Sequence, residues 1–495
     1  MRDDWIEIKY KDLVDKVSTS KQKIKQKEYL QKGLYPVIDQ GQELIGGYTD
    51  NKKNLLKCQL PAIVFGDHTK IVKLINFQFA PGADGTKVLE PKKFVAPEYL
   101  TYLSQILVLK IKDKGYARHY QHIEKQRLFL APLPEQRAIV AKIDQLFSDL
   151  DNGISNLKVV KAKLEIYRQA VLKKAFEGEL TKDWREKQTH LPIVDEILEQ
   201  IKEERQKRYQ KQVVKWEQVV LEWEMNGKVE KRPVRISKPK LLSGLTEEEV
   251  NIYGVLPNKW AWSRFCNVTY KIGDIDHKMP KTYPGGIPYL STGNLKSDGS
   301  IDFKGIKTIS KEDYYRLSLK IKPEKGDIIF PRYGTIGRNI LINFDKEFLV
   351  SYSCAIIKNI PSIINEKYVY YYSLSYVIQN EIKKYTVQTT QANIGISSIE
   401  NFVFPLCSTE EQHAIVQAIE SRLSVCDKLS KSIDQSLKKA KALRQSILKK
   451  AFEGKLLTEA ELQACRQEPD WEPAKKLLAR INKKQTIKPS RKRKS

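Results

Sequence analysis

The chain has 495 residues, enough for two or three domains with sizeable hydrophobic cores. Its formal net charge of +27 predicts a polyanionic partner, and nucleic acid is the first candidate. No stretch reaches the run of about 18 apolar residues that a membrane span needs. The start, MRDDWIEIKY, has acids where a signal peptide has basic and then apolar residues, so we expect a soluble, cytoplasmic protein.

The cysteines are scattered along the chain. They form no CxxC pair and have no histidine at metal-ligand spacing, so the sequence predicts neither a zinc site nor a disulfide framework. We expect reduced thiols at Cys58, Cys266, Cys354, Cys407, Cys426 and Cys465.

A first globular domain is predicted over residues 1–131. Short apolar runs such as LPAIVFG alternate there with turns marked by glycine and proline, which is typical of an α/β or β-rich domain with an irregular, twisted sheet. Polar side chains of the kinds that read DNA bases follow its expected strand ends. These candidate DNA-binding residues are Gln40, Gln42, His68, Thr69, Lys70, Arg118, Tyr120 and Gln121.

A helical region is predicted over residues 132–182. It begins after a proline-containing turn and ends with paired lysines and a glycine in the repeated stretch LKKAFEG, as a helix C-terminus prefers. Apolar residues recur every seven positions, which predicts a coiled-coil helix. The expected seam consists of Ile143, Leu150, Leu157, Leu164 and Val171, with Leu146, Val160 and Tyr167 at the alternate positions.

Residues 183–245 are expected to connect the two halves of the chain. The stretch from Leu191 to Asn226 has the pattern of a charged amphipathic helix, which Asn226 and Gly227 end. A basic linker with prolines, KRPVRISKPK, follows and leads to the second half.

A second globular domain, over residues 246–404, faintly resembles the first. The stretch IPYLSTGN corresponds to YPVIDQGQ, and DIIFPRYGT corresponds to AIVFGDHTK, each pair being a strand followed by a polar turn. Its candidate DNA-binding residues are Thr292, Asn294, Arg332, Tyr333, Thr335, Arg338, Gln388, Thr390, Gln391 and Asn393. Arginine binds guanine, amides bind adenine and threonine contacts the thymine methyl, whereas any one such residue alone is more often a solvated loop residue.

A second helical region, over residues 405–457, repeats the first. EQHAIVQAI matches EQRAIVAKI, and LKKAFEG recurs letter for letter, at one constant displacement without a gap. Its seam has Ile419, Ile433 and Ile447 but also Arg422 and Ser436, so we expect it to drift from a strict heptad. Residues 458–495 are expected to form a basic C-terminal tail, disordered over IKPSRKRKS.

The outer faces of the two helix endings are identical, which core packing alone does not require. We therefore expect a partner to dock on both copies in the same way, although two amphipathic helices in ordinary cores would also give the periodicity. The expected subunit-interface residues are Lys173, Lys174, Phe176, Glu177, Lys449, Lys450, Phe452 and Glu453.

The sequence carries almost no sign of catalysis. It has no phosphate-binding GxxxxGK[ST] loop, no adenine-methylation motif and no HExxH. One weak signal is Asp84 with Glu90 and Lys92, the residue types of a metal-dependent nuclease in which carboxylates hold Mg²⁺. His119 and His122 lack a third ligand and are expected to be polar loop residues.

A duplicated DNA reader is best arranged about a two-fold axis perpendicular to the duplex. Such symmetry makes the two long helices antiparallel, so that they pack as a spacer between two different recognition domains. The predicted fold is α/β (α+β), with twisted mixed sheets in both domains, an antiparallel coiled coil and pseudo-two-fold symmetry. The predicted target is bipartite and asymmetric, with an unread gap.

This layout resembles the specificity subunit of Type I restriction-modification enzymes. The resemblance is carried by PLPEQRAIVAKID, the repeated LKKAFEG, LPNKWAWSRF, VFGDH and GDIIFPRYGTIG, and it covers the chain from Trp5 to about Leu457. It implies two target recognition domains and a non-catalytic, DNA-binding chain. It also implies that two methyltransferase subunits dock on the helical regions and that a motor-nuclease subunit joins them.

The resemblance assigns every cofactor to those partners: S-adenosylmethionine, ATP and Mg²⁺, with no cofactor and no metal site in this chain. Two rival functions remain open from the residues themselves. One is a metal-dependent DNA endonuclease that uses Asp84, Glu90 and Lys92. The other is a basic protein that binds nucleic acid without sequence preference.

Overall fold

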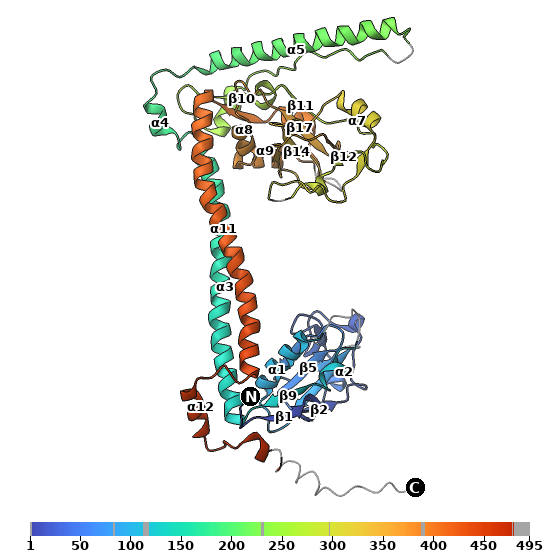
Figure 1. The fold of residues 1–495 in the computed structure, drawn as a ribbon, viewed down its shortest axis with the longest axis vertical. Helices are drawn as coiled ribbons and strands as arrows, with labels where there is room; N and C mark the ends of the chain where they lie inside the picture. Colours follow the sequence, from blue (N-terminus) through green and yellow to red (C-terminus); the bar gives the residue numbers. More distant parts are fainter. Residues whose placement is uncertain are drawn as a thin grey trace. The chain divides into compact units, whose positions relative to one another are not determined.

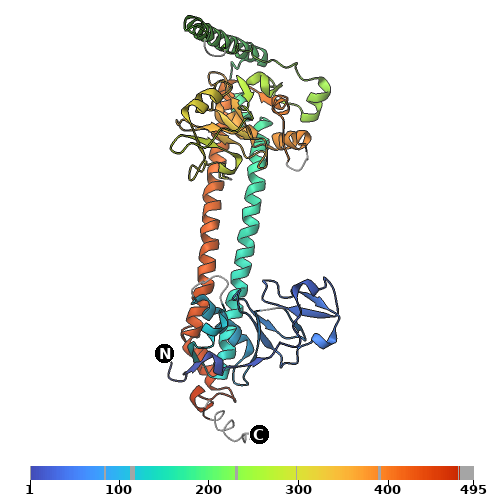
Figure 2. The ribbon, with the colours of Figure 1, turned by 90° about the vertical axis from the view of Figure 1, so that its right-hand side faces the viewer.

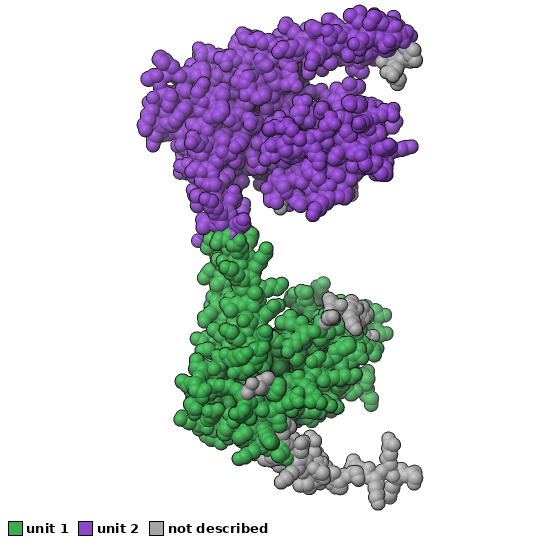
Figure 3. Space-filling view, viewed as in Figure 1, with its two compact units in different colours: residues 1–160, 432–495 green, residues 161–431 purple. Residues whose placement is uncertain are grey.

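A computed structural model describes residues 2–82, 85–111, 118–228, 232–296, 298–387, 392–477 and 479. The chain folds into two compact units (Figure 3). Unit 1 contains residues 1–160 and 432–495, and unit 2 contains residues 161–431. The last segment of the chain thus belongs to the same unit as the first, and each unit is described below by itself.

The first domain, in unit 1, is built on three small sheets. A four-stranded antiparallel sheet has the order β2-β8-β5-β6, a three-stranded mixed sheet has the order β4-β3-β7, and β1 pairs with β9. The strands are β1 (Ile6–Lys9), β2 (Val14–Val17), β3 (Tyr35–Ile38), β4 (Gly47–Thr49), β5 (Ala62–Gly66), β6 (Val72–Ile75), β7 (Ala80–Pro81), β8 (Thr86–Pro91) and β9 (Arg127–Leu130). The helices are α1 (Pro97–Leu109) and α2 (Tyr120–Ile123), with short 3-10 turns at Tyr10–Asp12, Gln26–Glu28 and Lys52–Asn54.

The second domain, in unit 2, repeats these sheets strand for strand. Its orders are β11-β17-β14-β15, β13-β12-β16 and β10-β18. The strands are β10 (Ala261–Arg264), β11 (Lys271–Gly273), β12 (Ile287–Leu290), β13 (Thr308–Ile309), β14 (Ile328–Pro331), β15 (Ile340–Leu341), β16 (Leu349–Val350), β17 (Cys354–Lys358) and β18 (Val403–Leu406). The helices are α6 (Glu247–Tyr253), α7 (Lys311–Ser318), α8 (Glu366–Ser373), α9 (Tyr376–Tyr385) and α10 (Ile396–Glu400), with 3-10 turns at Phe265–Val268 and Thr292–Asn294.

The pairing register matches the two domains residue by residue. In the first domain Val88 of β8 lies between Val64 and Val17, and in the second Ile356 of β17 lies between Ile329 and Gly273. The expected mixed-sheet fold is therefore confirmed in both domains, and the faint sequence resemblance between them reflects one fold used twice.

Two long helices carry the domains, α3 (Leu133–Phe176) and α11 (Thr409–Phe452). In unit 1 the start of α3 runs antiparallel to the end of α11, and the Arg444 guanidinium lies 3.1 and 3.2 Å from the two carboxylate oxygens of Asp151 (Figures 1 and 2). In unit 2 the end of α3 runs beside the start of α11, where Arg168 pairs with Asp427. The expected antiparallel packing of the helices is present within each unit.

One row of the seam of α11 is more regular than the sequence suggested. Buried side chains recur every seven residues along it, at Ile419, Cys426, Ile433, Ala440 and Ile447. The small cysteine and alanine side chains thus complete one row of the seam, whereas Arg422, Leu429 and Leu443 at the alternate positions are exposed, so the expected drift from a strict heptad stays a prediction. On α3 the seam positions expected at Val160 and Tyr167 are exposed, since α3 contacts one partner helix and leaves its other face to solvent.

The repeated LKKAFEG endings dock on the domains. At the end of α3, Phe176 is buried in unit 2, with ring centroids 5.2 and 5.0 Å from Tyr368 and Tyr372. At the end of α11, Phe452 packs in unit 1 with its ring centroid 5.1 Å from that of Tyr99. The expectation that Phe176 faces another subunit is therefore wrong, because its ring is buried within this chain, whereas Phe452 is only partly buried and its contact with another subunit stays a prediction.

The helix beginnings are anchored by a buried glutamate. Glu135, in the first turn of α3, accepts a hydrogen bond of 2.8 Å from the indole nitrogen of Trp5. Glu411, in the first turn of α11, accepts the same bond at 2.8 Å from Trp260, and Arg185 pairs with its other oxygen. Both carboxylates are almost fully buried, and these partners offset the cost of burial at both oxygens of Glu411 and at one oxygen of Glu135, whose Oε1 has no hydrogen-bond partner among the described residues.

The following glutamine repeats this pattern. The Gln136 side chain donates to the carbonyl of Ala131 at 2.9 Å and accepts from the amide of Ala96 at 2.8 Å. The Gln412 side chain donates to the carbonyl of Cys407 at 2.9 Å and accepts from the amide of Asn365 at 2.8 Å. The Glu-Gln pair thus fixes each helix to the domain that precedes it.

The connector contains the helices α4 (Lys182–Glu186) and α5 (Val194–Met225), and the C-terminal segment contains α12 (Glu459–Arg466). The first half of α5 packs on the second domain, where the buried Arg205 donates to the carbonyls of Lys240 and Asn267 (Figure 1). No helix of the described residues is both long enough and apolar enough to cross a membrane.

The segment after α11 differs from the expected tail. Leu462 and Cys465 of α12 are buried in unit 1, Arg466 lies 2.9 Å from Asp4, and Arg137 forms two hydrogen bonds with Asp470. Residues 458–477 are thus a folded part of unit 1, and IKPSRKRKS lies outside the described residues.

We expect Phe176→Ala to destabilise unit 2 by about 3–5 kcal/mol, because it leaves a cavity between α3 and α8. The exposed neighbour Lys173→Ala should change stability by less than about 0.5 kcal/mol. Urea unfolding of the full chain measures both variants, and an equal effect of the two would contradict this account of the repeat.

Candidate nucleic-acid interface

In unit 1, predicted residues from two loops meet beyond the ends of β3 and β5. The Thr69 hydroxyl donates to the carbonyl of Gln40 at 2.7 Å, and the His68 amide donates to the Gln40 side-chain oxygen at 3.2 Å. Gly85 packs against the Gln40 and His68 side chains with φ +85°. A Cβ added at this glycine would lie 2.7 Å from the side-chain oxygen of Gln40 and 2.7 Å from a ring carbon of His68. Gln40, His68 and Thr69 therefore form one surface, next to the exposed Gln42.

Asp67 ties a third loop to this surface. Its buried carboxylate accepts a hydrogen bond of 2.8 Å from the amide of Tyr120, and its carbonyl accepts one of 2.8 Å from the amide of His119. These bonds hold the start of α2, where Arg118 and Gln121 are exposed, against the strand end. Lys70 turns the chain with φ 63° and contributes a cation at the same place.

Tyr120 does not belong to the surface. It is 4% exposed and its ring lies 5.6 Å from that of Phe65 in the hydrophobic core. The prediction that Tyr120 contacts DNA is therefore wrong, because its long-range packing against β5 was not visible in the local sequence.

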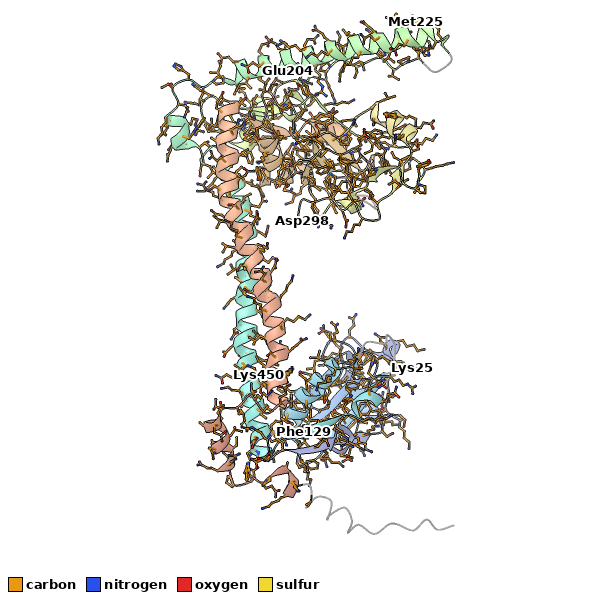
Figure 4. All side chains as sticks on the ribbon, in the orientation of Figure 1. Lys25, Phe129, Glu204, Met225, Asp298 and Lys450 are labelled. Atoms are coloured by element: carbon orange, nitrogen blue, oxygen red, sulfur yellow. The ribbon has the colours of Figure 1, made fainter. Side chains whose placement is uncertain are left out.

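A set of cations in the first domain was missed by the sequence analysis. The loop between β2 and β3 carries exposed lysines at positions 21, 25, 27 and 32, and Figure 4 labels Lys25. Lysines at this density are typical of phosphate contacts. The signal was present as the basic run KQKIKQK, which is a pattern of nucleic-acid patches.

In unit 2, Arg332 occupies the position expected of a base reader but is buried. Its side-chain Nε donates to the carbonyl of Ile394 at 2.9 Å, and one terminal nitrogen pairs with Asp274. Burial raises the pKa of the Asp274 carboxyl, but hydrogen bonding to Lys320 and the Arg332 charge outweigh this and leave the pKa below its ordinary value. The prediction that Arg332 reads bases is corrected, since its guanidinium neutralises a buried carboxylate.

Asn294 is also used within the fold. Its side-chain oxygen accepts from the amide and hydroxyl of Ser291 at 2.9 and 3.0 Å, and its amide nitrogen donates to the carbonyl of Asp302 at 3.4 Å. These bonds close the 3-10 turn that presents the half-buried Thr292.

The remaining described candidates of unit 2 lie around the connection between β14 and β15. Tyr333 and Thr335 are half-buried and Arg338 is exposed, and Tyr333 forms an isolated bridge with Asn393. Gln388, Thr390 and Gln391 lie outside the described residues. Thr292 follows β12, whose end is held to the segment after β16 by the amide of Ser351, which donates to the carbonyl of Leu290 at 2.7 Å.

The described residues give little support to the nuclease alternative. Glu90 accepts a hydrogen bond of 2.8 Å from the amide of Gln59, Lys92 pairs with Asp15, and Asp84 lies outside the described residues. The residues that the structure describes contain no group of three or more His, Cys, Asp or Glu side chains placed to hold a metal ion.

Known proteins share this architecture. A chain in a solved structure concerned with complex assembly and conformational transition of the type I R-M system aligns over 92% of this chain and 99% of its own length, with a TM-score of 0.55 and 15% sequence identity. That likeness shows the fold.

Curated relatives are more similar in sequence. The specificity subunit of Type I restriction enzyme EcoBI from Escherichia coli is 27% identical over 327 residues, which are 66% of this chain and 58% of that subunit. The specificity subunit of Type I restriction enzyme EcoDI from Escherichia coli is 24% identical over 378 residues, 75% of this chain and 72% of that subunit. The family model of the Type I restriction modification DNA specificity domain matches residues 2–158 and 264–439, more than half of the chain, and the chain therefore belongs to this family.

Proposed function

We propose that this chain is the DNA-reading specificity subunit of a Type I restriction-modification complex. Each domain reads one part of a bipartite, asymmetric target, and the chain itself performs no chemistry. The family supports this function, and the relatives that carry it are themselves named specificity subunits. A chromosomal DNA target supports a cytoplasmic location, which is part of the proposal.

One structural observation supports the proposal independently of the family match. Both domains gather polar side chains from equivalent strand ends, and a Glu-Gln pair and a LKKAFEG ending fix each domain to the long helices in the same way. A reader must hold its contact residues in register with the DNA helix, and rigid anchoring of each domain supplies this.

Two methyltransferase subunits are the proposed partners of the helix endings. Lys173 and Glu177 form an i,i+4 pair at 3.8 Å, and Lys449 and Glu453 form the same pair at 3.9 Å. Lys174 and Lys450 extend the two matching exposed surfaces, and Figure 4 labels Lys450. A motor-nuclease subunit joins this core, and S-adenosylmethionine, ATP and Mg²⁺ belong to the partners.

The rival function is binding of nucleic acid without sequence preference, which the charge of +27 also favours. Its affinity falls with salt equally for every sequence, whereas a specific reader retains a preference for its site.

The first test is a map of modified adenines in cells that express the chain with its methyltransferase partner. We expect one split, asymmetric motif, and an exchange of residues 268–400 for those of another family member should change one half of it only. A stable complex that gives no motif would leave the chain as a scaffold and favour nonspecific binding.

A second prediction concerns two arginines of the same connection. Arg338→Ala should relax recognition in one half-site by about 1–3 kcal/mol, because the exposed side chain is placed to contact a base. Arg332→Ala should instead destabilise unit 2 by about 3–5 kcal/mol, because it leaves Asp274 without a buried partner. Motif mapping and thermal unfolding measure the two effects, and an equal loss by Arg338→Ala on all sequences would make it a phosphate contact.

Charge reversal tests the docking surfaces. Lys173→Glu with Lys174→Glu should remove one methyltransferase from the complex, and Lys449→Glu with Lys450→Glu should remove the other, because each pair belongs to one helix ending. Native mass spectrometry counts the subunits. The same reversal at Lys207 and Lys211 on α5 is the control, and a complex that keeps both methyltransferases in the first two variants would move the interface elsewhere.

A further inference from the structure

An exposed histidine in the second domain is held in one orientation from two sides. His277 lies in the loop after β11, and its side chain is 62% exposed. Its Nε2 lies 3.3 Å from a carboxylate oxygen of Asp274, and its ring stacks on Tyr352 with centroids 4.7 Å apart and planes 19° from parallel. The ring is thus held through Nε2 and on one face, and most of the side chain is exposed.

The carboxylate of Asp274, which contacts His277, is itself held by two cationic side chains. Lys320 donates to one oxygen of Asp274 at 2.9 Å, and Arg332 pairs with the other. Arg332 also lies over the ring of Tyr333, 5.6 Å from its centroid, and that ring meets Tyr352 edge-on at 6.2 Å. A buried ion network therefore supports three neighbouring rings at the proposed DNA surface.

The first domain does not repeat this network. By the strand register, Gly273 corresponds to Val17 and Phe330 to Phe65, so Ser18 stands at the position of Asp274 and Asp67 at that of Arg332. The buried charged side chain that follows the central strand is thus an acid in the first domain and a base in the second. Whatever the His277 cluster contacts is therefore specific to the second domain.

The carboxylate sets the hydrogen-bonding character of the imidazole. Ionised Asp274 only accepts, so in a neutral imidazole it selects the tautomer with the proton on Nε2, which leaves Nδ1 as an acceptor. In the major groove of DNA, acceptors pair with the exocyclic amino groups of cytosine and adenine. A ring that is already ordered loses little side-chain entropy on binding.

We propose that His277 reads a base of the second half-site, accepting a hydrogen bond at Nδ1 from the amino group of a cytosine or adenine. Asp274 and Tyr352 are its positioning residues. The inference rests on the proposed function and deepens it by naming one base-reading atom.

The test is motif mapping and DNA binding with His277→Ala in the full complex with the methyltransferase partner. We expect one cytosine or adenine position of the second half-site to become degenerate, the first half-site to be unchanged, and affinity for the wild-type target to fall about tenfold or more. His190→Ala, which removes an exposed histidine of the connector, is the matched control and should change neither.

Two outcomes overturn the inference alone: an unchanged motif and affinity, or an equal loss on every sequence, which makes His277 a phosphate contact. A wild-type complex without any motif overturns the proposed function and this inference with it, so the two failures are distinguishable.

The positioning role has its own readout. Tyr352→Leu removes the stacking ring and should loosen recognition at the same base position as His277→Ala, whereas Tyr352→Phe keeps the ring and should restore it. If both variants lower the melting temperature and neither changes the motif, Tyr352 is only structural.

Discussion

The fold depends on a buried carboxylate at the start of each long helix. A carboxylate removed from water is costly unless it has partners, and Glu411 is paired by the indole of Trp260, the guanidinium of Arg185 and the hydroxyl of Thr181. These partners come from the strand that opens the domain and from the segment that follows the end of α3. One side chain thus joins three distant parts of unit 2, and Glu135 with Trp5 joins the start of α3 to the start of the first domain in unit 1.

Sequence patterns were sufficient to predict the repeated architecture but not to predict which side chains are exposed. The duplication and the heptads predicted both helices, because periodicity is a local property. Tyr120 and Arg332 were assigned to the DNA surface because their residue types suit it, yet Phe65 and Asp274, which are distant in sequence, bury them. The seam at Cys426 was missed because its residue type is not a typical seam residue.

An asymmetric target requires two readers that differ although their backbones agree. The sheets correspond strand for strand, and the difference lies in the side chains beyond the strand ends. Asp67 binds backbone amides and presents the start of α2, whereas the equivalent Arg332 neutralises a carboxylate that orients an imidazole. A buried charge of opposite sign therefore supports a different exposed surface on the same scaffold, as the proposed function requires of two different readers built on one duplicated fold.

The composition of the units determines when the residues of each unit become available during synthesis. Unit 2 is continuous in sequence, so the ribosome has supplied all of its residues once Lys431 is made. Unit 1 needs Ile447, Leu448 and Ala451 for its core, and these residues come last. Domains generally fold from the N-terminus first as the chain emerges. Until these residues are made, the apolar surface around Tyr99 in the first domain stays exposed to water. We therefore expect chaperone dependence and aggregation to be greatest for the first domain.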